Sequence, residues 1–274
     1  MDETQLEAVI AASIQRQSAG LPVVENADVV MDYLLSPEFE AAAIVSTDSR
    51  IIFLDLSIGS EALGVPLKNL PVERFSQLVE QRLESADTGF AFGRWGEPRE
   101  LYSSELFVKE PLQNVESRSI HMGVDLFCKA GTPVFAPLAG RVHIKANNAV
   151  ELDYGPMIVL EHMTPTGESF YSLYGHLSLD GVAHISEGQQ VSAGDRIATI
   201  GSAPENGNWP PHLHFQLILD LLGLGADFPG VALRSRQDVW LAMSPLPGMF
   251  FPECDANSLD GSESAKTTMN TLAQ

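Results

Sequence analysis

After Gly89 the chain is a succession of short β-prone runs separated by glycine, proline, asparagine and aspartate, and this alternation most constrains the fold. The runs are TPVFAPL, GRVHIKA, PMIVLEH, ESFYSLYGHL, GQQVSAG, DRIATIG and HLHFQLIL. Connections this short join antiparallel strands, because parallel strands need a crossover of a dozen or more residues. The pattern predicts a mainly β core of antiparallel strands, in two sheets folded on each other or partly closed.

The residues before this core have a different texture, which predicts an α+β segment. Helices are expected over 3–17 and over 28–44, the second interrupted at Ser36-Pro37. The runs AAIVST and IIFLDLS flank the polar turn DSR and predict a β-hairpin. A cleaner helix follows Pro71, with five apolar residues on one face of a 3.6-residue period: Val72, Phe75, Leu78, Val79 and Leu83.

These changes of texture divide the chain into three expected parts. Residues 1–115 form the α+β segment, residues 116–245 the β core, and residues 246–274 a polar carboxy-terminal tail. The first boundary falls in the polar stretch LQNVESRS. The tail is low in aromatic residues beyond Pro252 and has no periodicity, so we expect it to be disordered.

Charge and cysteine content limit the partners and the compartment. With 16 basic and 36 acidic side chains, the formal charge of −20 repels nucleic-acid phosphates and anionic lipid headgroups, so neither nucleic acid nor a membrane surface is an expected partner. The amino terminus, MDETQLEAVIAASIQRQ, lacks the positive region of a secretion signal, and we find no apolar run long enough to span a membrane. Two cysteines fit a reducing compartment. We therefore expect a cytoplasmic location.

Histidine and aspartate recur in three short clusters of the β-rich part: HMGVD at 121–125, YGHLS at 174–178 and HLH at 212–214. In a straight strand, His121 and Asp125 would lie about 13 Å apart, too far to bind one ion. The segment must bend if both bind a metal, and Gly123 permits that bend.

The HLH cluster places two imidazoles on one face of a strand, about 6.5 to 7 Å apart, so both can reach one cavity. Either both bind a metal, or one binds while the other transfers protons; spacing does not decide between these. Asp125 adds a carboxylate oxygen, and two histidines with one carboxylate and an open fourth position form a known type of catalytic zinc site.

The remaining candidates have structural interpretations. Cys128 lies three residues beyond Asp125 and would point to the opposite face of a strand, into the core. His143, His162 and His184 have no partner of ligand type nearby in the sequence. Trp209 could line a substrate groove, but packing is the favoured interpretation.

The order HMGVD, YGHLS, HLHF resembles the lysostaphin-type (LytM-like) zinc metallopeptidases, whose β-sheet core, of the duplicated-hybrid-motif type, cleaves peptide cross-links of bacterial cell walls. AGTPVFAPLAGRV and GQQVSAGDRIATIG resemble the segments between these motifs, and the resemblance covers residues 116–220. It implies a Zn²⁺ cofactor with His121, Asp125 and His214 as ligands. His176 and His212 are implied as non-ligating catalytic histidines, one taking the proton of the attacking water and the other stabilising the oxyanion.

A narrower likeness involves GRWGEPRELYSSELF, LDYGPMIVLEH, NGNWPPHLHFQLILDLLG through DFPGVA, and IIFLDLSIGS. These segments resemble the metallopeptidase part of long fused bacterial chains that also hold a kinase-like phosphotransferase and a class III aminotransferase. The resemblance implies an aminotransferase or kinase-like partner protein. It leaves the substrate open between a peptidoglycan peptide (muropeptide) and a soluble peptide or amide. The alternative function is a non-catalytic zinc-binding scaffold or regulatory module of a larger metabolic assembly.

Overall fold

The computed structural model describes residues 3–47, 50–68, 70–101 and 116–262. Its helices are Glu3–Ser18 (α1), Ala27–Leu34 (α2), Val72–Ser85 (α3), Leu179–Val182 (α4), Gln237–Met243 (α5) and Ala256–Leu259 (α6), with 3₁₀ turns at Gly225–Asp227 (η2), Arg234–Arg236 (η3) and Gly248–Phe250 (η4). Its strands are Ile51–Leu54 (β1), Phe90–Gly93 (β2), Arg118–His121 (β3), Val124–Phe127 (β4), Pro133–Phe135 (β5), Gly140–Asn148 (β6), Gly155–Met163 (β7), Ser169–Gly175 (β8), Gln190–Val191 (β9), Arg196–Thr199 (β10), His212–Ile218 (β11) and Val231–Leu233 (β12).

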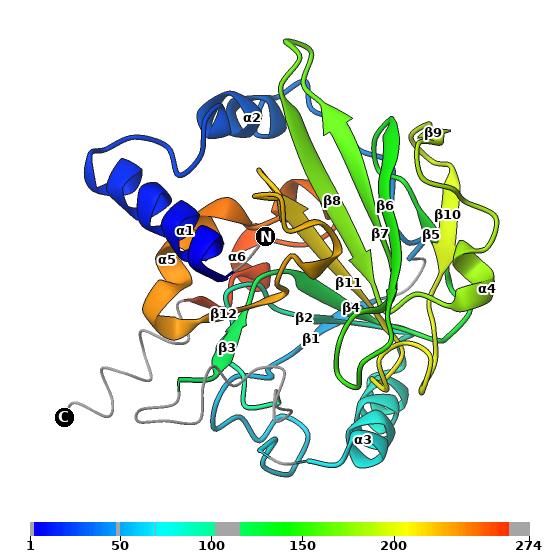
Figure 1. Ribbon diagram of the computed structural model, residues 1–274. Helices are drawn as coiled ribbons and strands as arrows, with labels where there is room; N and C mark the ends of the chain where they lie inside the picture. The colour runs from blue at the N-terminus through cyan, green and yellow to red at the C-terminus, as the bar shows by residue number, and fades with distance from the viewer. Residues whose placement is uncertain (1–2, 48–49, 69, 102–115, 263–274) are drawn as a thin grey trace.

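One large sheet of eight strands organises the molecule, in the order β1-β2-β4-β11-β8-β7-β6-β9 (Figure 1). Two small sheets, β5 with β10 and β3 with β12, accompany it. The fold is mainly β, as expected, and the pairs within the core are antiparallel. The expected arrangement of two antiparallel sheets is wrong in its details, because β1 and β2 pair in parallel at one edge and make the large sheet mixed.

The hairpin expected around DSR is absent from the described residues. The run IIFL forms β1, but its partner is β2, which comes only after α3. AAIVS lies elsewhere, along β5, where Phe135 donates a backbone hydrogen bond to the Ile44 carbonyl and Ala42 donates one to that of Pro137. The two β-prone runs are adjacent in sequence, but each finds a better buried partner at a distance.

The helices agree more closely with expectation. The helices expected over 3–17 and after Pro71 are confirmed as α1 and α3. The helix expected over 28–44 ends at Leu34, and residues 37–44 contain no helix. A residue that precedes proline disfavours the α-helical conformation, and Ser36 is such a residue. Within the described residues, no helix is both long and apolar enough to cross a bilayer.

Two hydrophobic clusters fill the molecule. The larger surrounds β7, β8 and β11, whose side chains are buried on both faces of the sheet. The smaller joins α3 and β1 to β4 through apolar side chains that include Phe75 and Phe127. The sheet and this second cluster both continue across the expected boundary after residue 115, which itself lies at the end of an undescribed range. The boundary stays a prediction.

The expected disorder of residues 246–274 is wrong for residues 246–262. This stretch contains η4 and α6, and Phe250, Phe251 and Leu259 are buried in the large cluster. Phe250 and Phe251 both pack edge-on against Phe215 of β11. Three apolar side chains in a polar stretch provide enough burial to hold it on the core. Residues 263–274 lie outside the described residues.

Candidate metal centre

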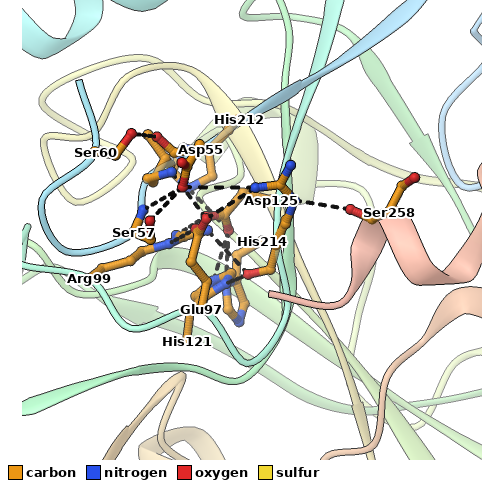
Figure 2. Close-up of polar contacts among 12 residues, drawn as sticks. Asp55, Ser57, Ser60, Glu97, Arg99, His121, Asp125, His212, His214 and Ser258 are labelled. Carbon is orange, nitrogen blue, oxygen red and sulfur yellow. Dashed lines mark hydrogen bonds and ion pairs between the residues drawn. The ribbon is translucent and has the colours of Figure 1, made fainter. Parts of the chain in front are cut away.

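Three strands bring His121, Asp125 and His214 together, although 93 residues separate the first from the last (Figure 2). His121 ends β3, Asp125 lies in β4, and His214 in β11 pairs directly with Asp125. The His121 Nε2 atom lies 3.0 Å from His214 Nδ1, and each of these nitrogens lies 3.1 Å from Asp125 Oδ1. All three side chains are buried.

The bend that the sequence required occurs at Met122-Gly123, between β3 and β4. A Cβ atom on Gly123 would lie 2.6 Å from the Phe215 carbonyl oxygen and 2.7 Å from His214 Cε1. Glycine is therefore required here for a second reason besides its backbone freedom. It lets the bend approach the ring of His214 closely.

The protonation of His121 follows from its second nitrogen. Its Nδ1 lies 2.9 Å from the Arg94 carbonyl oxygen, which can only accept a hydrogen bond. Nδ1 therefore carries the hydrogen. Burial lowers the pKa of His121 to about 4, so the ring is neutral near pH 7 and Nε2 bears a lone pair.

His214 is held in the same way by Gln216, which lies two residues further along the same face of β11. The Gln216 amide nitrogen donates to the Pro229 carbonyl and to Ser244 Oγ, which leaves Oε1 as an acceptor. His214 Nε2, 3.0 Å from that oxygen, is therefore the donor. In the neutral ring, the lone pair is then on Nδ1, which faces His121 and Asp125.

Two imidazole lone pairs and a carboxylate oxygen thus converge with no hydrogen available between them. Burial by itself would raise the pKa of Asp125, but the Arg99 guanidinium beside it helps to hold the pKa well below its usual value, so the carboxylate is ionised. Such a set repels itself unless a cation lies at its centre. In tetrahedral zinc sites, the ligand atoms stand about 3.3 Å apart, as the usual bond lengths require. The donor set and its spacing fit Zn²⁺.

The other two histidines of the sequence motifs lie beside this group. His212 donates from Nδ1 to the Pro210 carbonyl at 2.7 Å, and its Nε2 lies 3.7 Å from Asp125 Oδ1. His176 follows β8 and donates from Nδ1 to the Asn206 carbonyl at 2.9 Å. The two rings lie 4.3 Å apart, centre to centre. Burial lowers the pKa of both, so both are neutral and have a lone pair on Nε2.

His176 occupies an unusual backbone conformation, with φ of 62°. Residues other than glycine rarely adopt this left-handed region, and such strain concentrates at functional sites. Hydrogen bonds on both sides hold it: its N–H donates to Tyr154, and its carbonyl accepts from Gly201. The conformation turns the chain immediately after Gly175, which pairs with His214.

All five residues line one cavity of about 330 Å³. Apolar side chains that line it include Leu56, Phe75, Phe127, Leu152 and Trp209. Polar side chains among the lining residues include Arg118, Asp153 and Asp227. The structure therefore places the five histidine and aspartate positions of the sequence motifs at a single site with room for a ligand.

The residues expected to be structural lie outside this cavity, except Trp209. Cys128 is buried in the core, where burial raises the pKa of its thiol to about 12. His143, His162 and His184 contact β-strand neighbours instead. Trp209 is almost fully buried, so it packs as favoured, but it also lines the cavity beside His176 and His212.

His121, Asp125 and His214 are called the metal group from here on. Four residues around it were not singled out in the sequence: Glu97, Arg99, Asn206 and Gln216. The period-2 pattern of β11 could have found Gln216, because it follows His212 and His214 on the same face. No pattern predicts Arg99, which lies in the irregular stretch GEPRE and reaches Asp125 from outside the motifs.

A family model described as Peptidase family M23 matches residues 119–221. The lipoprotein YgeR of Escherichia coli is 33% identical over 95 residues, which are 35% of this chain and 33% of that protein. The murein hydrolase activator NlpD of the same species is also 33% identical over 95 residues, 35% of this chain and 22% of the relative. Lipoprotein NlpD of Yersinia enterocolitica is 33% identical over 93 residues, 34% of this chain and 84% of the relative.

Among solved structures, the catalytic domain of lysostaphin from Staphylococcus simulans is 24% identical, with a TM-score of 0.36. The match covers 62% of this chain and 96% of that domain. In the two Escherichia coli relatives, by contrast, the chain spans only a third or less of the protein's length.

The cytoplasmic location expected from the sequence is contradicted by these names. YgeR, an NlpD/LppB homologue of Pseudomonas aeruginosa and the Yersinia NlpD are all named lipoproteins. The expectation relied on the amino-terminal residues and on a count of two cysteines. Neither feature reports the compartment directly, because a few free cysteines are compatible with more than one environment.

Proposed function

The chain belongs to peptidase family M23, and on this premise we propose that it is a zinc metallopeptidase that hydrolyses an amide bond with a metal-activated water. The observation that carries the proposal is the convergence of three lone pairs, from His121, Asp125 and His214, inside a cavity that two further neutral histidines line. Bound zinc would supply Lewis-acid chemistry there, polarising a carbonyl and lowering the pKa of a bound water to about 7.

His176 and His212 are the proposed proton-transfer residues. Backbone carbonyls hold the Nδ1 hydrogen of each ring, so the free nitrogen of each neutral ring is an acceptor. One ring takes the proton of the attacking water at Nε2 and becomes a donor, which can then protonate the leaving amine. The other ring lies 4.3 Å away, centre to centre, and would stabilise the developing oxyanion only in its protonated form, because in the neutral ring its Nε2 is an acceptor as well. The assignment between the two is open, since both Nδ1 atoms are fixed alike.

We propose a peptide substrate, either a peptidoglycan peptide or a soluble peptide. The cavity lining combines apolar side chains with polar side chains of both charge signs, which suits a segment with an apolar side chain and a polar backbone. Relatives named murein hydrolase activators favour the peptidoglycan peptide.

The decisive experiment measures zinc content and peptide hydrolysis on the same samples of the parent, His121→Ala, His212→Ala and His184→Ala. The parent is expected to hold about one zinc per chain and to cleave muropeptides or peptides. His121→Ala is expected to lose zinc and activity together, while His212→Ala keeps zinc and loses at least about 100-fold in rate. His184→Ala is the control, because its side chain lies outside the cavity. If the parent takes up no zinc when zinc is supplied, the proposal is wrong.

A second candidate function is that of a non-catalytic regulator. Relatives named murein hydrolase activators support it. All five site residues are present in this chain, which favours the enzyme. The discriminating measurement adds the His212→Ala variant to a murein hydrolase. Stimulation equal to that of the parent, with no hydrolysis by the parent alone, would favour the regulator.

The narrower likeness to fused chains suggests one further partner, an aminotransferase or kinase-like protein. The resembling segments include IIFLDLSIGS and GRWGEPRE, which contribute β1 and the stretch around Arg99. Co-purification of the chain with such a protein from its own cells is the test. Its absence from the purified material would remove this partner without affecting the peptidase proposal.

A further inference from the structure

Arg99 links the metal group to a second buried carboxylate (Figure 2). Its Nη1 donates to Asp125 Oδ2 at 2.6 Å, and its Nε donates to Glu97 Oε2 at 2.8 Å. The Arg99 and Glu97 side chains are 3% and 0% exposed. Asp125 therefore has its two oxygens in different roles. Oδ1 faces the histidines, and Oδ2 is occupied by the guanidinium.

Glu97 is itself firmly held. Its Oε1 accepts a hydrogen bond from the Leu56 backbone N–H at 3.0 Å and lies 3.8 Å from Arg94 Nη1. Burying an ion pair costs much of what its attraction provides, so a pair of this kind contributes little net stability. What it does provide is a fixed direction, since the planar guanidinium can reach two carboxylates at once only in one orientation.

The backbone next to this pair leaves space for the guanidinium. Gly93 of β2 pairs with Asp125 of β4 in the sheet. A Cβ atom at Gly93 would lie 2.7 Å from Arg99 Nη2 and 3.4 Å from Asp125 Cβ. The absence of a side chain at this point of β2 is thus what lets Arg99 lie alongside Asp125. The residues concerned, 93–99, all precede the family-model match at 119–221.

We propose that Arg99, anchored by Glu97, is a positioning residue that occupies Oδ2 of Asp125 and restricts this ligand to a single oxygen toward zinc. The inference rests on the proposed zinc site and adds a positioning role for the segment before the matched region. With one carboxylate oxygen and two imidazole nitrogens, the protein supplies three ligand atoms and keeps a fourth position open. Without Arg99, Oδ2 becomes free to approach the same ion.

The test compares four variants with the parent: Arg99→Gln, Gly93→Ala, the double variant Glu97→Gln/Arg99→Gln, and Arg141→Gln. Gly93→Ala displaces the guanidinium without changing any charge, and the double variant removes the Glu97 carboxylate together with its guanidinium partner, so a folding defect in Arg99→Gln alone does not end the test. Arg141 is the matched control, because it pairs with Glu161 at the surface of β6, away from the site. Thermal unfolding of each metal-free variant reports whether it is folded.

Two measurements distinguish a role of Arg99 in positioning Asp125 from a role in stabilising the fold alone. Zinc affinity, measured by competition with a chromophoric chelator, is expected to fall about 10- to 100-fold in the three site variants and to stay unchanged in Arg141→Gln. The extended fine structure of the zinc X-ray absorption spectrum is expected to show one more oxygen atom bound to zinc in the site variants than in the parent. Unchanged affinity, or weaker affinity with an unchanged number of neighbours, would overturn the positioning role while leaving the peptidase proposal intact. A parent that binds no zinc would overturn both.

Discussion

At the scale of single residues, burial lowers the pKa of His121, His162, His176 and His212, including one that lies outside the site. His162 has no part in the metal group, yet its environment is as closed: Nδ1 faces the Ala139 carbonyl and Nε2 faces Ser172 Oγ. Burial lowers the pKa of His162 from 6.5 to about 4. Its neighbours stabilise a neutral ring, and the side chain is buried from water. A histidine in a β-rich sequence can thus be a core residue with two hydrogen bonds.

This shift predicts a loss of stability in acid. Between pH 6.5 and 4 the unfolded chain binds a proton at His162 and the folded chain does not, so the free energy of unfolding falls as pH falls. A shift of this size is worth about 3 kcal/mol across the window. Other buried histidines titrate there too, so the measurement is a difference. The stability gap between the parent and His162→Gln, from urea unfolding, should narrow by that order between pH 7 and pH 4. A constant gap would contradict the prediction.

Gly123 is a second residue whose role is local. Gly123→Ala would place a methyl group against the Phe215 carbonyl and the His214 ring, and the carbonyl belongs to a central strand that cannot easily move. We expect zinc affinity to fall roughly 10- to 100-fold, because His214 must shift. Gly89→Ala is the matched control, since a Cβ atom there meets nothing within 4 Å. Equal zinc affinity in the two variants would show that the bend tolerates a side chain.

At the scale of elements, α3 contributes Phe75 to the cavity lining and also supports His212. Phe75 of α3 packs edge-on against Phe127 at 6.1 Å between ring centres, and Phe127 stacks on His212 at 4.9 Å. A helix in the amino-terminal part therefore holds, through one aromatic ring, a residue proposed to transfer protons. The amphipathic pattern of α3 predicted that this face is buried, but not what it is buried against.

Phe75→Ala tests that contact. Removing a fully buried aromatic ring is expected to lower the free energy of unfolding by about 3 to 5 kcal/mol. It should also lower kcat more than zinc content, because Phe127 loses its support behind His212. Leu83→Ala, at a half-buried position of the same helix, is the control and should cost less. If both variants lose kcat equally at equal stability, the link through Phe127 is wrong.

At the scale of the whole molecule, one sheet unites the segments that the sequence divides. β1 and β2 extend the sheet at β4, and β3 pairs with β12, which carries the chain toward α5 and the carboxy-terminal turns. His121, Asp125 and His214 lie where β3, β4 and β11 meet, so the three residues of the proposed metal site connect most of this framework. A cation bound there should stabilise the fold as a whole.

Removal of zinc is therefore expected to lower global stability. A ligand at 100 times its dissociation constant stabilises the folded state by about 2.7 kcal/mol, so a chelator should lower the free energy of unfolding of the zinc-loaded parent by an amount of that order, and its unfolding midpoint with it. His121→Ala provides the comparison, because its midpoint should not respond to the chelator. An identical midpoint with and without zinc would show that the ion contributes nothing to the fold.

The sequence alone determined the mainly β class, α1 and α3, because hydrophobic period is a local property. The five histidine and aspartate positions were implied by the resemblance to a peptidase family, and their roles stay a proposal. The sequence misjudged the pairing of β1, the extent of α2 and the order of residues 246–262, because partners for these segments come from distant parts of the chain. Only the tertiary structure decided that His121, Asp125 and His214 share one point, and that Arg99 and Gln216 orient two of them. Register between strands far apart in sequence sets such contacts, and no local pattern carries that register.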